Sequence, residues 1–91
     1  MYKPRIKIEL FGTPRMVAGT RRIEATGEDL GTLFQNACNK VPSLRDHIVN
    51  SEGTWLNAGY TFVVDGQFTN DPKHYVDPES DVLLVSRASG G

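Results

Sequence analysis

Apolar and charged residues alternate near the start of the chain. In the segment RIKIELF, Ile6, Ile8 and Leu10 are separated by single charged residues, and this period of two is typical of a strand with one buried face. Phe11 breaks the alternation, so it falls on the outer face of the predicted strand. RRIEAT predicts a second strand, and the turn residues of GTPRMVAGT between the two segments indicate an N-terminal hairpin.

The segment TGEDLGTLFQNACNKVP predicts the main helix. Its apolar residues recur at helical spacing and form one continuous stripe, which consists of Leu30, Leu33, Phe34, Ala37, Cys38 and Val41. Thr26 is followed three residues later by Asp29, which is the spacing of a capping box and makes Thr26 the expected N-cap. Gly31 costs the helix about 1 kcal/mol relative to alanine. Pro42 ends the helix.

The second half of the chain predicts a short helix and three more strands. SLRDHIV favours the helix, NSEGTWLNAG a loop, and YTFVVDG a strand that turns at Asp65 and Gly66 into a brief strand at 67–69. NDPKHYVDPES is rich in turn residues, and DVLLVSR predicts the last strand. The expected fold is α+β, with a mixed sheet packed on one main helix.

The predicted last strand is apolar on both faces. One face consists of Val82, Leu84 and Ser86, and the other of Leu83, Val85 and Arg87. Such runs usually belong to strands that are covered on both sides, but the sequence supplies only one substantial helix. Either the loops around Trp55 and 74–76 cover the second face, or a partner does. Phe11 would join Val85 on that face if their strands were neighbours.

Composition and charge narrow the function classes. A chain of 91 residues forms one domain, too small to enclose a deep catalytic cavity with a lid. Residues 1–22 carry six basic residues and one acidic residue, although the net charge is −1. The basic residues are not interleaved with aromatic residues as nucleic-acid binding requires. The sequence has one cysteine and shows neither a signal peptide nor a membrane-length apolar stretch, so we expect a cytoplasmic protein without nucleic-acid or membrane partners.

No group of side chains has the spacing of a catalytic or metal site. His47 and His74 lack further ligands nearby, and zinc needs three or four. The acidic loop residues lack the order of a calcium-binding loop; they are Asp71, Asp77, Glu79 and Asp81. Cys38 falls on the apolar stripe of the helix, which indicates an unreactive core thiol. We therefore expect no metal site and no enzymatic activity of the chain alone.

The unusual feature is the end of the sequence, SRASGG. A carboxylate must be activated before it can acylate anything, for example as a mixed anhydride with AMP. Two glycines allow a backbone to pass through a channel that any Cβ would block. We expect a domain over 1–86 and a flexible tail over 87–91 that presents the carboxylate of Gly91. The alternative is that this Gly/Ser-rich end has no function.

Three segments, in this order, carry a resemblance to a known family. They are ELFGTPRMVAGTRRIEATGEDLGTLFQ, EGTWLNAGYTFVVDGQ and DVLLVSRASGG. They resemble the ubiquitin-like sulfur carriers of the MoaD/ThiS group, which include CysO-type carriers, and the VLLVSRASGG ending is similar to that of the ubiquitin-related modifier. The resemblance spans essentially the whole chain and implies a β-grasp fold.

The resemblance implies a function for the tail. Gly91 would be adenylated by an E1-like enzyme of the MoeB/ThiF type with ATP, and a sulfur donor would convert it to a thiocarboxylate. Gly90 would form the narrow neck beside it. Phe11 and Val85 match positions of an apolar docking surface, to which we add Leu83 and Arg87 as expected partner-binding residues. No bound cofactor is implied, because the partner uses the ATP.

The carrier would donate its sulfur to a MoaE-like or another synthase in cofactor or metabolite biosynthesis, molybdopterin being one product. Two departures argue against choosing one pathway. Ser86 and Arg87 stand where MoaD proteins often have a Pro-Pro pair, and Thr61 replaces a common asparagine. Two other functions stay open: a modifier conjugated through Gly91 to target lysines, and a β-grasp binding module without tail chemistry.

Overall fold

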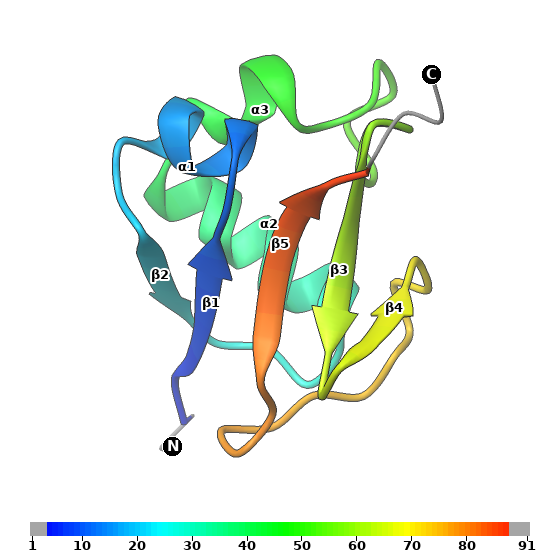
Figure 1. The fold of residues 1–91 in the computed structure, drawn as a ribbon. Coiled ribbons are helices and arrows are strands. Elements are labelled where there is room, and N and C mark those ends of the chain that lie inside the picture. The colour runs from blue at the N-terminus through cyan, green and yellow to red at the C-terminus, as the bar shows by residue number, and fades with distance from the viewer. Residues whose placement is uncertain (1–3, 88–91) are drawn as a thin grey trace.

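The computed structural model describes residues 4–87, which form one mixed sheet with three helices (Figure 1). The elements are β1 (Ile6–Leu10), α1 (Thr13–Ala18), β2 (Arg22–Ala25), α2 (Leu30–Lys40), α3 (Leu44–His47), β3 (Tyr60–Val64), β4 (Gln67–Thr69) and β5 (Val82–Ser86). The predicted strands and the two predicted helices are therefore all present. Of the predicted tail, only Arg87 is described; Gly90 and Gly91 lie outside the described residues.

The five strands lie in the order β2-β1-β5-β3-β4. The pairs β1–β2, β3–β5 and β3–β4 are antiparallel, whereas β1 and β5 run parallel. The last strand of the sequence therefore occupies the centre of the sheet. The helix α2 crosses behind the sheet, and α1 and α3 lie at one end of it (Figure 1). This arrangement confirms the α+β fold class.

The core lies between α2 and the inner face of the sheet. The predicted alternation in β1 is confirmed, because Ile6, Ile8 and Leu10 are buried and the charged residues between them are exposed. The helix contributes the buried residues Leu30, Leu33, Phe34, Ala37 and Cys38. Three aromatic rings pack at the centre of one half of this core; Phe34, Trp55 and Phe62 have centroids 5.7–5.9 Å apart.

The main helix begins later than the capping-box spacing predicted. Asp29 is the N-cap, and its Oδ1 accepts a hydrogen bond of 2.8 Å from the N–H of Thr32. The carbonyl of Thr26 instead accepts a hydrogen bond from the side-chain amide of Asn36, 2.7 Å away. The prediction that Thr26 caps the helix is therefore wrong. The backbone is still extended at Asp29, which forms a bridge with the loop at Tyr75, so the helix cannot start before it.

The loop that contains Tyr75 also accepts hydrogen bonds from the first N–H groups of α2. The N–H of Leu30 donates to the carbonyl of His74 at 3.0 Å, and that of Gly31 to the carbonyl of Pro72 at 2.7 Å. A Cβ on Gly31 would lie 3.1 Å from both the Cβ and the carbonyl oxygen of Pro72. Close packing of the loop explains a glycine that helix propensity alone disfavours.

Sequence patterning missed α1, which occupies what we expected to be a turn region. Pro14 lies in its first turn, and Gly19 ends it in the left-handed conformation at φ 73°. The segment is only six residues long, too short to show an apolar period. In contrast, the turn between β3 and β4 is as expected, since Asp65 and Gly66 both have positive φ angles, 52° and 85°.

Candidate functional site

The outer face of the sheet, which points away from α2, is the most distinctive surface of the molecule. In β5, Val82 and Leu84 are buried in the core, whereas Leu83 and Val85 point to the outer face and are half-buried. The strand is thus apolar on both faces, as the sequence indicated. The helices cover only one side of the sheet (Figure 1).

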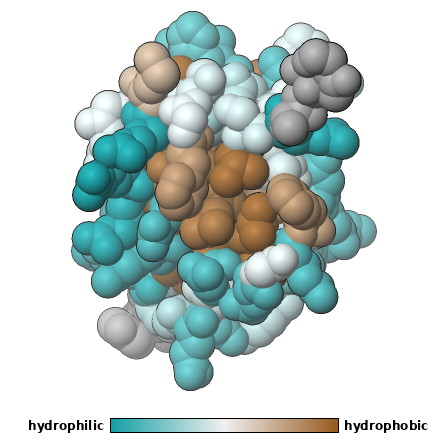
Figure 2. Space-filling view, in the orientation of Figure 1, coloured by the Kyte–Doolittle hydropathy of each residue, from teal (hydrophilic) through white to brown (hydrophobic). Residues whose placement is uncertain are grey.

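Strand register gathers apolar residues from four segments on this face. Val63 lies opposite Leu83 on one side and Phe68 on the other. Phe68 and Phe11 are 75% and 44% exposed. We call the resulting set the outer patch; it consists of Phe11, Val63, Phe68, Leu83 and Val85. Figure 2 shows apolar residues gathered at the middle of this face with polar residues around them.

Phe11 reaches the patch because β1 and β5 are parallel neighbours. Leu10 lies beside Leu84, and the N–H of Phe11 donates to the carbonyl of Leu84 at 3.1 Å. Continuing the register by one residue places Phe11 beside Val85. The condition set by the sequence, that the two strands be neighbours, is therefore met.

The two loops that were one possible cover for this face lie on the other side of the sheet. Trp55 packs on Phe34 and Phe62 in the core, and its indole N–H donates to the carbonyl of Asn70 at 3.1 Å. Val76 is buried, and its N–H donates to the carbonyl of Glu28 beside the start of α2. Of the two alternatives, cover by these loops is therefore wrong, because both loops pack on the side of the sheet that α2 covers.

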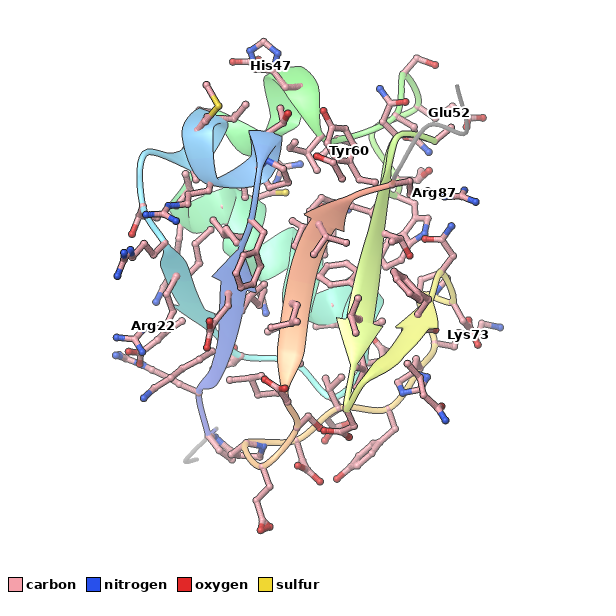
Figure 3. All side chains as sticks on the ribbon, in the orientation of Figure 1. Arg22, His47, Glu52, Tyr60, Lys73 and Arg87 are labelled. Atoms are coloured by element: carbon pink, nitrogen blue, oxygen red, sulfur yellow. The ribbon has the colours of Figure 1, made fainter. Side chains whose placement is uncertain are left out.

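At the end of β5 the chain is still held by the sheet. Ser86 pairs with Tyr60, and the N–H of Arg87 donates to the carbonyl of Gly59 at 2.8 Å. A Cβ on Gly12 would lie 3.3 Å from the Ser86 Oγ, so α1 begins close against this end of the strand. Figure 3 shows Arg87 where β5 ends, next to the outer face. The described chain therefore ends at the rim of the outer patch.

The cysteine and the acidic loop residues that were considered as reactive or metal-binding groups stabilise the fold. Cys38 is fully buried, and burial raises the pKa of its thiol to about 11, while the smaller effect of the Arg45 charge lowers it. The Asp71 and Asp77 carboxylates accept hydrogen bonds from backbone N–H groups two residues ahead, as turn residues do. Across residues 4–87, no three His, Cys, Asp or Glu side chains gather closely enough to hold a metal ion.

Within the same range, no helix has the length and apolar character needed to cross a membrane. Val63 and Phe68 were not among the predicted site residues. Their signal was nonetheless present, because a two-residue turn at 65–66 places them opposite each other on one face of the hairpin.

Comparison with known proteins identifies the fold. No family model and no curated protein matches the sequence. Among solved structures, SAMP1 from Haloferax volcanii is similar with a TM-score of 0.83 and 18% identity, over 97% of this chain and 100% of that one. Urm1 from Trypanosoma brucei has a TM-score of 0.72 and 19% identity, over 100% and 99%. A chain of the Amycolatopsis orientalis BexX/CysO complex has 0.75 and 13%, over 94% and 99%.

These likenesses extend over nearly the whole of each chain, and they confirm the ubiquitin-like β-grasp fold. The resemblance drawn from the sequence is therefore confirmed at the level of the fold. At identities below one fifth, what the tail and the outer patch do must be argued from the chain's own residues.

Proposed function

We propose that this chain is a ubiquitin-like sulfur carrier that bears its sulfur on the carboxyl group of Gly91. The observation that carries the proposal is the path of β5, which passes through the centre of a β-grasp sheet, beside an exposed apolar patch, and leads towards Gly90 and Gly91. The strand that contributes Leu83 and Val85 to the docking surface would then also lead to the reactive group. The protein acts as a cosubstrate, and the partner supplies the catalytic groups.

The proposed chemistry has two steps. An oxygen of the Gly91 carboxylate attacks the α-phosphorus of ATP, and pyrophosphate leaves, so that a mixed anhydride with AMP remains. Hydrosulfide, or an equivalent sulfur donor, then attacks the acyl carbon; AMP leaves, and a thiocarboxylate is formed. Gly90 and Gly91 carry no side chain, so they can enter a narrow channel beside the nucleotide.

The outer patch would supply the affinity for the activating enzyme. Burial of Phe68 and Phe11 removes large aromatic surfaces from water, and central aromatic residues commonly dominate docking energies. Arg87 is still fixed by its hydrogen bond to Gly59, so the position where the tail begins is set by the sheet. The four residues after it can span at most about 14 Å. The reacting carboxylate would therefore lie within that distance of the docked domain.

The partners we propose are an E1-like adenylyltransferase of the MoeB/ThiF type, a sulfur donor, and a MoaE-like or other synthase that accepts the sulfur in the cytoplasm. Molybdopterin and sulfur-containing metabolites are both suitable products. The similar chain from Amycolatopsis orientalis belongs to a crystallised BexX/CysO complex, which supports docking of this fold on a second protein in general.

The test is the intact mass of the full chain after incubation with an E1-like enzyme, ATP and sulfide. We expect a gain equal to the replacement of one oxygen by sulfur, which should be absent from a variant lacking Gly91. Val85→Asp should slow the reaction without unfolding the protein, whereas Lys73→Asp, in the loop that follows β4, should leave the rate unchanged. A folded chain that gains no sulfur with several such enzymes would refute the carrier function.

A second function is favoured by one comparison. The solved structures with this fold include the small archaeal modifier protein 1 of Haloferax volcanii. As a modifier, this chain would form an amide bond between Gly91 and a target lysine, with AMP as the leaving group. Tagged chain in cell extracts should then migrate as higher-mass conjugates that disappear with the variant lacking Gly91. Sulfur loading without conjugates would favour the carrier alone.

A further inference from the structure

The strand β2 forms one edge of the sheet, and half of its backbone groups point away from β1. The N–H of Leu10 donates to the carbonyl of Arg21 at 2.8 Å, so this pair belongs to the hydrogen-bonded positions of the antiparallel ladder. Such positions alternate along an antiparallel pair. Ile23 therefore also bonds to β1, whereas the N–H and carbonyl groups of Arg22 and Glu24 point outward.

The outward carbonyls and the outward N–H groups differ in their partners. The carbonyl of Glu24 accepts from the Nζ of Lys40 on α2, and that of Arg22 accepts from the Thr20 hydroxyl at 3.3 Å. The N–H groups of Arg22 and Glu24 have no acceptor among residues 4–87. The outward carbonyl groups of this edge therefore already have hydrogen-bond donors, whereas its outward N–H groups can still donate to a ligand.

Positive charge surrounds these free donors. Glu24 lies opposite Lys7 and Glu9 lies opposite Arg22 in the β1–β2 register, so each carboxylate on the outer side faces a cation. Arg21 and Lys40 add two further positive charges beside the edge. A shallow depression of about 560 Å³ runs along it; its lining consists of Glu9, Thr20, Arg21, Arg22 and Glu24. Arg22 and Lys73 lie at opposite sides of the sheet in Figure 3.

We propose that the β2 edge binds an acidic extended segment of a partner protein by addition of a strand. Residues 22 and 24 are separated by about 6.6 Å along a strand, which matches alternate carbonyl groups of an extended segment. Those carbonyls would accept from the two free N–H groups, and carboxylates of the segment would meet the Arg21 and Lys40 charges. A basic segment would be repelled by the same charges. This surface is independent of the outer patch and of the tail.

The probe is a synthetic peptide of about six residues, an ordinary strand length, with alternating valine and aspartate. Titration into isotope-labelled full chain should shift the amide resonances of Arg22 and Glu24 and slow their hydrogen exchange. Glu24→Pro removes one outward donor at an edge position where proline is tolerated, and should weaken binding about fivefold. Glu24→Gln is its matched control, because it loses the carboxylate but keeps the N–H; its affinity should not fall.

A second pair of variants tests the charge. Arg21→Glu should weaken binding about fivefold, and Lys73→Glu, the same change at the far side of the sheet, should leave it unchanged. Affinity should fall as salt is added. The proposal is overturned if the peptide fails to bind, if it shifts outer-patch resonances in place of those of β2, or if folded Glu24→Pro binds as tightly as Glu24→Gln. Val85→Asp should affect sulfur loading but not this binding, so the two proposals can fail separately.

Discussion

Gly27 lies in the connection between β2 and α2, at a point where the chain passes against the helix. A Cβ added there would lie 2.5 Å from the backbone nitrogen of Leu33, 2.8 Å from its Cα and 3.1 Å from its Cβ. Leu33 is fully buried and lies near the start of α2. The contact is therefore with helix backbone inside the core, and it cannot be relieved by rotating an exposed side chain. We predict that Gly27→Ala destabilises the fold.

The magnitude follows from two opposing effects. Forcing an extra methyl group into a packed interior costs about 1–3 kcal/mol. Replacing glycine by alanine also restricts the unfolded chain, which returns about 0.4–1 kcal/mol. The net loss should be about 1–2 kcal/mol of unfolding free energy. For a domain of this size each kcal/mol lowers the Tm by about 4–8 °C, so the shift should be readily measurable.

The assay is urea unfolding followed by Trp55 fluorescence and by circular dichroism. Gly59→Ala is the matched control, since no atom lies within 4 Å of its added Cβ and its φ is not in the left-handed region. Its stability should be unchanged or higher by up to about 1 kcal/mol. Equal stability of the two variants would refute the reasoning, because it would show that the backbone of α2 moves aside at no cost.

Three further predictions address the helix cap, the thiol and the outer patch. Asp29→Ala should cost about 1 kcal/mol of stability in urea unfolding, while Thr26→Ala should cost clearly less; the reverse order would restore the capping box that the sequence suggested. The folded Cys38 thiol keeps its proton to a higher pH than the unfolded one, so stability should fall as the pH rises from 9.0 to about 11, and Cys38→Ala should lack this component. Phe68→Ser should change stability by less than about 0.5 kcal/mol, because the ring is mostly exposed, yet slow sulfur loading about tenfold; unchanged loading would exclude Phe68 from the docking surface.

Much of the fold could be predicted because its segments carry strong local patterns. The alternation in β1, the apolar stripe of α2 and the Asp65–Gly66 turn each follow from residue chemistry and need no tertiary information. The start of α2 could not be predicted in this way, because both Thr26 and Asp29 are good caps. The bridge between Asp29 and Tyr75, which lie far apart in the sequence, decides between them.

The candidate site was predictable in part for a similar reason. The apolar outer face of β5 and the off-period Phe11 are visible in the sequence, and the parallel register of β1 and β5, continued by one residue, places Phe11 beside Val85. Whether the Trp55 loop covers that face depends on the side of the sheet on which Trp55 packs. An aromatic residue in a loop can turn to either side. Its contact with Phe34 follows from the space left beside α2, which no local pattern encodes.

The central position of β5 also bears on synthesis at the ribosome. Of the described strands, β5 is made last, yet it joins β1 to β3, so neither half of the sheet can reach the other before it has been translated. Contacts between such distant parts of a chain slow folding, because the entropy of loop closure is lost before these contacts form and stabilise the fold. A nascent chain that stops before Val82 would leave unpaired the backbone edges of β1 and β3 that β5 joins. Only chains translated through β5 can therefore complete their fold, and an interrupted product would be left open to proteases.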